Sequence, residues 1–211
     1  MPGRLSIETI RREAGRRDLD PGALRAFAMV ESPGRGFLDD GRCRVVLRGE
    51  VLWRRLQAAG IAPWALHTYH PELCFPELTT TTRKYTLGGP QEWDRIARAI
   101  AFGTMPPNPR RGSYELAVYE ACAWGRFGLL GAHYAAAGYR DVIDLKTDHE
   151  KHEAAQLKAI LRWMESNGLL DRLRRLDWQG FAAGYNGHTV AGKYASRLAK
   201  AYRSFGALVI A

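Results

Sequence analysis

Residues 20–31, with the sequence DPGALRAFAMVE, decide the fold of this chain. Asp20 can cap a helix, and Pro21 has the fixed φ that suits a first helical residue, so a helix begins here. Three apolar residues and one carboxylate then recur at the spacing of one helix face: Leu24, Phe27, Ala28 and Glu31. The pattern predicts a core helix that ends with a carboxylate on its apolar face, before Pro33 and Gly34 stop it.

The position of Glu31 suggests a chemical role. An apolar neighbourhood removes water from the carboxyl group, and the C-terminal end of the helix dipole adds negative charge nearby. Both effects raise the pKa of a carboxyl group, as a general acid working near neutral pH requires. A glutamate that turns outward into solvent at the helix end is the alternative, and the pattern alone leaves both open.

A second carboxylate follows within a short distance along the chain. Residues 36–38 and 44–47 flank Asp39-Asp40-Gly41, and because Asp-Gly is a favoured hairpin turn, this segment predicts a small β-hairpin. Glycoside hydrolysis normally uses two carboxylates, and Asp39, Asp40 and Glu50 are the candidates for the second. Ordinary turn chemistry also explains the two aspartates, and a preference for a helix N-terminus also explains Glu50.

Helical spacing dominates the rest of the chain, so we expect one mainly α domain over residues 1–211, with the small hairpin beside a cleft. Residues 63–91 are rich in proline, threonine and glycine, which predicts a long loop that lines a cleft or contains short helices. Residues 125–131 predict a tight glycine turn. Further helices are expected at residues 6–15, 51–59, 90–102, 114–124, 133–138, 141–166, 169–184 and 191–205.

Charge and cysteine content limit the classes of function. The formal net charge of +9 favours polyanionic partners, but the basic residues are spread along the chain and form no nucleic-acid recognition motif. Three widely spaced cysteines outside any C-x-x-C pair indicate neither a disulfide framework nor a zinc site. Without an apolar leader or a membrane span, we expect synthesis in a reducing cytoplasm and no integral membrane contact.

No cofactor or metal site is expected. His149, Glu150, His152 and Glu153 lack the spacing of the H-E-x-x-H zinc motif and fit a solvated helix face better. The glycine turn at 125–131 does not match a nucleotide-binding loop, and no Ser-His-Asp or Cys-His set has a local signature.

Several short segments, in order along residues 20–203, resemble the N-acetylmuramidase domain of phage endolysins and related bacterial proteins. The segments are Ala26-Phe27, Val30-Glu31-Ser32, Gly34-Arg35-Gly36-Phe37-Leu38, Asp40-Gly41-Arg42, His70-Pro71, Trp124-Gly125 with Phe127, Gly131, Gly138-Tyr139, and Tyr185-Asn186-Gly187 with Tyr194, Leu198, Ala201 and Tyr202. The resemblance implies a lysozyme-like α+β fold and cleavage of the β-1,4 bond after N-acetylmuramic acid.

The resemblance also implies roles for individual residues. Glu31 matches the catalytic acid and Asp40 the acidic turn position, and Glu50 is displaced by two positions from a common carboxylate that is Arg48 here. Gly128, Leu129 and Leu130 also depart from the family pattern, as does His133. The residues expected to contact substrate are Arg35, Phe37, Phe127, His133, Tyr185 and Asn186.

The expected function is therefore peptidoglycan hydrolysis that lyses bacterial cells. We expect a monomer that needs no nucleic acid and acts in the periplasm or cell wall after release from the bacterial host cytoplasm. Two alternatives stay open at this point. One is a lytic transglycosylase, and the other is a catalytically weakened peptidoglycan-binding protein of a phage tail or secretion system.

Overall fold

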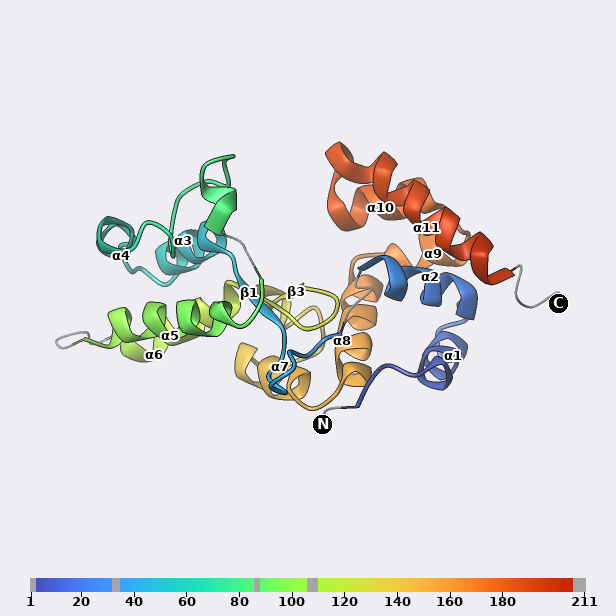
Figure 1. Cartoon of the computed structure of the whole chain (residues 1–211), viewed down its shortest axis with the longest axis horizontal. Helices are drawn as coiled ribbons and strands as arrows, with labels where there is room; N and C mark the ends of the chain where they lie inside the picture. Colours follow the sequence, from blue (N-terminus) through green and yellow to red (C-terminus); the bar gives the residue numbers. More distant parts are fainter. Residues whose placement is uncertain (1–2, 32–34, 86–87, 106–109, 207–211) are drawn as a thin grey trace.

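Helices make up most of the computed structural model, which describes residues 3–31, 35–85, 88–105 and 110–206. Figure 1 shows these helices in two groups on either side of a small central sheet. One group holds α3 to α6, within residues 49–120, and the other holds α1 and α2, within residues 7–31, and α9 to α11, within residues 169–206. The expected mainly α class with a small β element is confirmed.

Helix α2 (Pro21–Glu31) is the predicted core helix. Asp20 Oδ1 accepts a hydrogen bond from the backbone N–H of Gly22 at 2.7 Å, so the capping carboxylate satisfies an N–H that the helix itself leaves unpaired. Leu24 and Phe27 are fully buried. The helix packs against α11 (Ala191–Gly206), which in turn packs against α10 (Trp178–Asn186). The predicted stop at Pro33-Gly34 lies outside the described residues.

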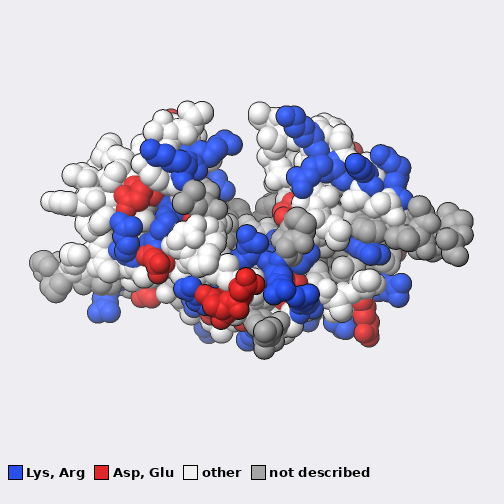
Figure 2. All heavy atoms as spheres, in the orientation of Figure 1, with Lys and Arg blue, Asp and Glu red and all other residues white. Residues whose placement is uncertain are grey.

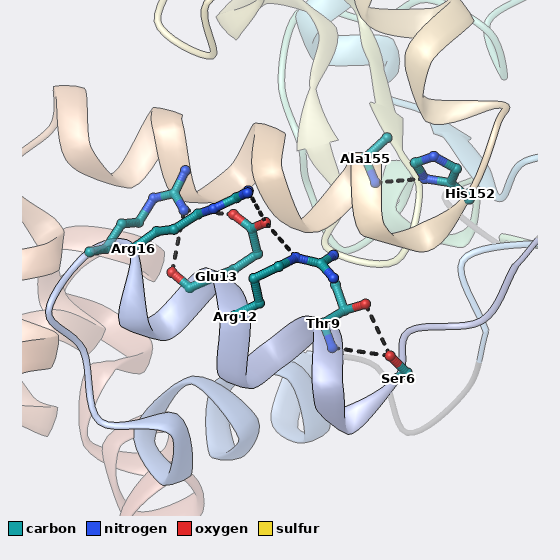
Figure 3. A network of polar contacts seen from close by, with 8 residues as sticks. Ser6, Thr9, Arg12, Glu13, Arg16, His152 and Ala155 are labelled. Atoms are coloured by element: carbon teal, nitrogen blue, oxygen red, sulfur yellow. Dashed lines mark hydrogen bonds and ion pairs between the residues drawn. The ribbon is translucent and has the colours of Figure 1, made fainter.

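Helix α1 (Ile7–Gly15) begins where Ser6 caps it, as Figure 3 shows. The Ser6 hydroxyl accepts a hydrogen bond from the Thr9 N–H at 3.0 Å. Glu13 on the same helix is buried, and it accepts hydrogen bonds from Arg16 at 3.0 Å and from Arg17 at 2.8 Å. Together with Arg12, whose Nε lies 3.8 Å from Glu13 Oε1, these cations compensate a carboxylate that would otherwise be costly to bury.

The predicted long helix at 141–166 is wrong, because the chain forms two helices here: α7 (Val142–His149) and α8 (Glu153–Ser166). His152 has an extended backbone, and its ring accepts a hydrogen bond from the Ala155 N–H at 3.0 Å, which caps α8 (Figure 3). The Glu153 N–H also donates to the Gly3 carbonyl at 3.1 Å. A contact with the distant N-terminal segment therefore interrupts a sequence whose local pattern favours one helix.

The predicted helix at 169–184 is likewise two helices, α9 (Leu169–Arg174) and α10. Asp177 separates them, because its side chain accepts a hydrogen bond from the Gly180 N–H at 2.9 Å and begins a new helix. The predicted helix at 191–205 is confirmed as α11.

The other group of helices comprises α3 (Gly49–Ala58), α4 (Trp64–Tyr69), α5 (Gln91–Thr104) and α6 (Arg111–Glu120). Residues 63–91 thus contain short helical pieces, α4 and the 3-10 turn η1 (Thr82–Tyr85), as one of the two readings of this segment expected. Buried Glu92 accepts hydrogen bonds from Arg95 at 2.7 Å and from the Leu47 N–H at 3.0 Å, which ties α5 to the sheet. Prolines 106, 107 and 109 lie outside the described residues.

The sheet differs from the predicted hairpin. Strand β1 (Val45–Leu47) pairs with β2 (Cys122–Trp124), and β2 pairs with β3 (Leu129–Leu130), all antiparallel. Residues 36–47 do form a tight turn with one bridge, between Phe37 and Cys43, but the strand that follows pairs elsewhere. The hairpin in the sheet is therefore β2–β3.

The turn of this hairpin contains Gly125 and Gly128, whose φ values of +70° and +57° cost glycine little. The predicted helix at 114–124 ends earlier, at Glu120, because residues 122–124 form a strand that pairs with β1 on one side and β3 on the other. The helix expected at 133–138 is the 3-10 turn η2 (Gly131–His133) followed by further turns. Across the described ranges, no helix combines the length and the apolar character that a bilayer span needs.

Candidate active site

Glu31 lines a cavity of about 440 Å³ where the sheet meets α2, α8 and α10. Figure 2 shows the surface hollowed between the two groups of helices, with Lys and Arg side chains on both rims. The described lining residues are Glu31, Val46, Arg48, Ala123, Phe127, Gly128, Leu129, Leu130, His133, Ile160, Trp163, Tyr185 and Asn186. Glu31 therefore points from the helix end into the cavity and does not turn outward into bulk solvent.

Two tyrosines hold the Glu31 carboxyl group. The Tyr185 hydroxyl, from α10, donates to Oε2 at 2.9 Å, and the Tyr194 hydroxyl, from α11, donates to Oε1 at 2.5 Å. Each oxygen thus has its own donor on a different helix. Because both tyrosines come from packed helices, the carboxyl group has little freedom to rotate.

An aromatic cluster fixes these tyrosines in turn. Tyr185 stacks on Phe181 and on Tyr194, with ring centroids 5.6 and 5.9 Å apart. Phe27, one turn before Glu31, stacks on Phe127 of the β2–β3 turn at 5.4 Å and meets Tyr185 edge-on at 5.4 Å. Contacts of this kind link α2, α10, α11 and the hairpin into one rigid support under the cavity.

Burial raises the pKa of Glu31, while the hydrogen bonds from Tyr194 and Tyr185 and the charge of Arg197 act in the opposite direction. Burial has the largest effect, so the raised pKa that the sequence predicted for Glu31 is confirmed. Burial also raises the pKa of both tyrosines, which keeps them protonated as donors. The cavity therefore presents a carboxylic acid that holds its proton to a higher pH than an exposed glutamate does, which is the direction that a general acid needs.

Four of the six residues expected to contact substrate line the Glu31 cavity: Phe127, His133, Tyr185 and Asn186. Burial lowers the pKa of His133, which favours its neutral form. The structure thus brings residues from η2, α10 and the β2–β3 turn together with Glu31, although they lie far apart in the sequence.

Arg35, Phe37 and Asp40 line a different cavity, of about 500 Å³, with Asp39 and Glu153 among its other lining residues. Asp40 lies on the exposed turn and accepts from Arg42, with an N–O distance of 2.7 Å. The Arg42 guanidinium and backbone N–H lower the pKa of Asp40, so this carboxyl group stays ionised. The structure does not bring Asp40 to the cavity of Glu31.

Glu50, the other expected carboxylate, is buried behind the cavity wall. Its Oε1 accepts two hydrogen bonds from Arg48, from Nε at 2.9 Å and from Nη2 at 2.6 Å. Arg48 lines the cavity, whereas Glu50 does not. All 22 Asp and Glu residues of the chain fall within the described ranges, and Glu31 is the one among them that lines this cavity.

Sequence reasoning missed three residues of the site: Tyr194, Arg48 and Trp163. Tyr194 is buried on α11, and a buried tyrosine hydroxyl needs a hydrogen-bond partner. This need was the signal that could have pointed to the Glu31 carboxyl group, to which Tyr194 donates. Trp163 meets the Tyr185 ring at 5.8 Å. For Arg48, the signal was its place in the chain, where the resemblance leads one to expect a carboxylate.

The histidine and acidic cluster at residues 149–153 is not the solvated helix face that the sequence predicted, because His149 and Glu153 are buried where α7 ends and α8 begins. His149 contacts the Leu145 carbonyl through Nδ1 at 2.9 Å, and Glu153 accepts from the Gly36 N–H at 2.6 Å and from Arg126 at 3.2 Å. No group of three or more His, Cys, Asp or Glu side chains that could hold a metal occurs in the part of the chain that the structure describes. Cys43, Cys74 and Cys122 are buried free thiols.

Comparisons with known proteins agree with this geometry. The N-acetylmuramidase family matches residues 20–206. The crystal structure of an endolysin from Burkholderia phage AP3 superposes with a TM-score of 0.83 at 30% sequence identity, covering 98% of this chain and 73% of the endolysin chain. None of the curated proteins matches. Ser32 and Gly34, which carry part of the resemblance, lie outside the described residues. The chain belongs to the N-acetylmuramidase family, and it is a glycoside hydrolase of the muramidase kind.

Proposed function

We propose that this muramidase hydrolyses the β-1,4 bond between N-acetylmuramic acid and N-acetylglucosamine in peptidoglycan, with Glu31 as the catalytic acid. The single observation that carries the proposal is the buried Glu31 carboxyl group, held by two tyrosine hydroxyls inside a cavity. The family supplies peptidoglycan as the substrate. A monomeric state and action in the cell wall after release stay predictions.

In the proposed mechanism, protonated Glu31 gives its proton to the glycosidic oxygen while the bond from that oxygen to C1 breaks. The leaving sugar departs with a hydroxyl group, and C1 gains oxocarbenium character. The Tyr185 and Tyr194 hydroxyls donate to the carboxylate that forms, so they stabilise it as it develops. Water then supplies the hydroxyl group to C1, and its proton returns to Glu31.

The proposal gives no chemical step to Asp40 or Glu50. Asp40 lines the other cavity and is ion-paired with Arg42, while Glu50 is buried in an ion pair with Arg48. With one carboxylate in the cavity, Glu31 has to serve in both proton transfers. Asn186 and Phe127, which line the same cavity, can contact the glycan through an amide and an aromatic face.

Replacing Glu31 by Gln tests the proposal. The variant keeps the shape of the side chain and removes the transferable proton, so the release of reducing ends from purified peptidoglycan should fall by about 10³-fold. The melting temperature should stay close to that of the wild type. Glu8→Gln, the same change on the exposed surface of α1, is the matched control and should keep full activity.

Masses of the products test the reaction type in the same experiment. Hydrolysis releases reducing ends, whereas a lytic transglycosylase closes the muramic 6-hydroxyl onto C1 and leaves 1,6-anhydro ends. Anhydro products from the wild type would overturn hydrolysis. Undiminished lysis by Glu31→Gln would remove Glu31 from the acid role.

A further inference from the structure

Arg48 carries a cation into the cavity of the catalytic acid. It follows β1 directly, where alternate residues face opposite sides of the sheet. Val45 and Leu47 are buried in the core, whereas Val46 and Arg48 line the cavity. The register of the strand therefore fixes the direction of Arg48, and a slip by one residue would remove the cation from the cavity.

Glu50 holds the Arg48 side chain in place. Both hydrogen bonds between them end on Glu50 Oε1, and they use Arg48 Nε and one hydrogen of Nη2. Within the described residues, no hydrogen bond is made by Arg48 Nη1. The Arg48 side chain keeps 36% of its surface exposed, while that of Glu50 keeps 7%. Donors of the guanidinium group thus stay open to a ligand in the cavity.

Glu50 balances the charge of Arg48 from outside the cavity, and the other described polar residues that line the cavity add no fixed negative charge when Glu31 is protonated. Tyr185 and Asn186 are neutral, His133 favours its neutral form, and Glu31 has to be protonated to act. Arg48 is the one Lys or Arg among the described lining residues. Glu50 fixes the orientation of the Arg48 guanidinium group. A guanidinium group held in this way suits a planar anion that can accept two parallel hydrogen bonds.

We propose that Arg48, oriented by Glu50, binds a carboxylate group of the peptidoglycan strand and so determines which glycans the enzyme accepts. The inference rests on the proposed function for its substrate class. The carboxylate can come from two sources. One is the lactyl group of muramic acid, which is free where the stem peptide is absent, and the other is the stem peptide itself.

Binding measured in the Glu31→Gln background tests this without turnover. Three soluble glycan fragments serve as probes. The first carries stem peptides, and the second has no peptides but has free lactyl carboxylates. The third is the second fragment with its carboxylates converted to methylamides. Adding Arg48→Met should weaken binding of at least one carboxylate fragment about tenfold, because a partly exposed pair of charge-assisted hydrogen bonds is lost. The methylamide fragment should bind both proteins equally.

The pattern across fragments identifies the source. A loss confined to the peptide-bearing fragment names the stem peptide, and a loss confined to the peptide-free fragment names the lactyl group. Arg48→Lys, which keeps the charge without the planar fork, should recover part of the affinity. Glu50→Gln should weaken the same fragment less than Arg48→Met, because it only loosens the orientation of the guanidinium group.

Equal affinity of the two proteins for both carboxylate fragments would overturn the inference. So would an equal loss for all three fragments, because a general structural role would not distinguish carboxylates from methylamides. Failure of the proposed function shows up elsewhere, as lysis by Glu31→Gln, so the two can be told apart. Arg48→Lys covers the case in which Arg48→Met does not fold.

Discussion

Glu31 and Asp40 lie close together in the sequence, but the structure places them in opposite surroundings. Glu31 ends a buried helix, and two neutral tyrosine hydroxyls are its hydrogen-bond partners. Asp40 lies on an exposed turn against the cation of Arg42. Burial raises the pKa of the first carboxyl group, and the guanidinium lowers the pKa of the second.

The contrast shows that position determines the chemistry of a carboxyl group in this fold. Removal of water favours the protonated form that a proton donor needs, whereas a cation and surrounding water favour a fixed negative charge. The tyrosines matter because they hold Glu31 without cancelling the effect of burial. A charged donor in their place would keep the group ionised and end its use as an acid.

Among the variants other than Glu31→Gln, shortening the acid should have the largest effect. Glu31→Asp removes one methylene group, so the carboxyl group no longer reaches both tyrosine hydroxyls and the bond to be cleaved. A displacement of about 1 Å can cost about 10²-fold in rate, and we expect a loss of that size in kcat for reducing-end release. Asp40→Glu, the opposite change at the exposed turn, is the control. Comparable losses in both variants would erase the contrast.

The next largest effect is expected on stability, from a side chain added at Gly36, which lies between Glu31 and Asp40 in the sequence. A Cβ atom there would lie 2.1 Å from Gln156 Oε1 and 3.1 Å from Arg126 Cβ. Gln156 is fully buried and hydrogen-bonded to the Arg126 N–H and the His149 carbonyl, so it cannot move aside. Gly36→Ala should lower the free energy of unfolding by about 1–3 kcal/mol, measured by urea titration.

Gly112→Ala is the matched control for this substitution. Gly112 lies in α6, and a Cβ atom there meets nothing within 4 Å. This alanine should leave the free energy of unfolding unchanged or raise it by up to about 1 kcal/mol, because glycine is unfavourable inside a helix. Equal stability of the two alanine variants would show that the packing around Gly36 can yield.

Removing one tyrosine donor should have a moderate effect with a characteristic pH dependence. Tyr194→Phe takes away a hydrogen bond that lowers the pKa of Glu31, so this pKa should rise further. Because the acid must be protonated, activity falls as the pH rises through that pKa, and the alkaline limb of kcat/KM should move to higher pH. The maximal rate should fall about tenfold, since the carboxyl group is less firmly held.

Tyr202→Phe provides the control from the same helix, because the Tyr202 hydroxyl donates to Asp20 at the other end of α2. Its pH profile should coincide with that of the wild type. A Tyr194→Phe profile that moves to lower pH would contradict the electrostatic account of the site.

The fold could be predicted from the sequence wherever local signals and tertiary contacts agree. The cap at Asp20 and the apolar face of α2 predicted one helix with the right ends, and the helix expected at 191–205 is α11. The prediction failed where distant contacts override the local pattern. The Glu153 N–H bonds to Gly3 and breaks a helix, and residues 122–124 leave a helical pattern to pair with β1.

The site divides in the same way. Helical spacing made Glu31 a candidate acid but left its direction open, and the resemblance favoured it as the acid and supplied Tyr185 and Asn186. Tyr194 and Arg48 could not be assigned, because their roles depend on which helix packs against α2 and on the register of β1. Proximity in sequence also misled, since Asp40 and Glu50 follow Glu31 closely in the chain but do not line its cavity.

The smallest effect is expected from Asp40→Asn. The change removes the negative charge beside Arg42 on an exposed turn, where water replaces a lost partner easily. Because Asp40 does not line the Glu31 cavity, the rate of reducing-end release should change by less than about threefold, and the alkaline limb of the pH profile should stay in place. Asp39→Asn on the same turn should behave alike. A loss of about 10²-fold in Asp40→Asn alone would mean that the two cavities act on one glycan strand, with Asp40 as the second carboxylate after all.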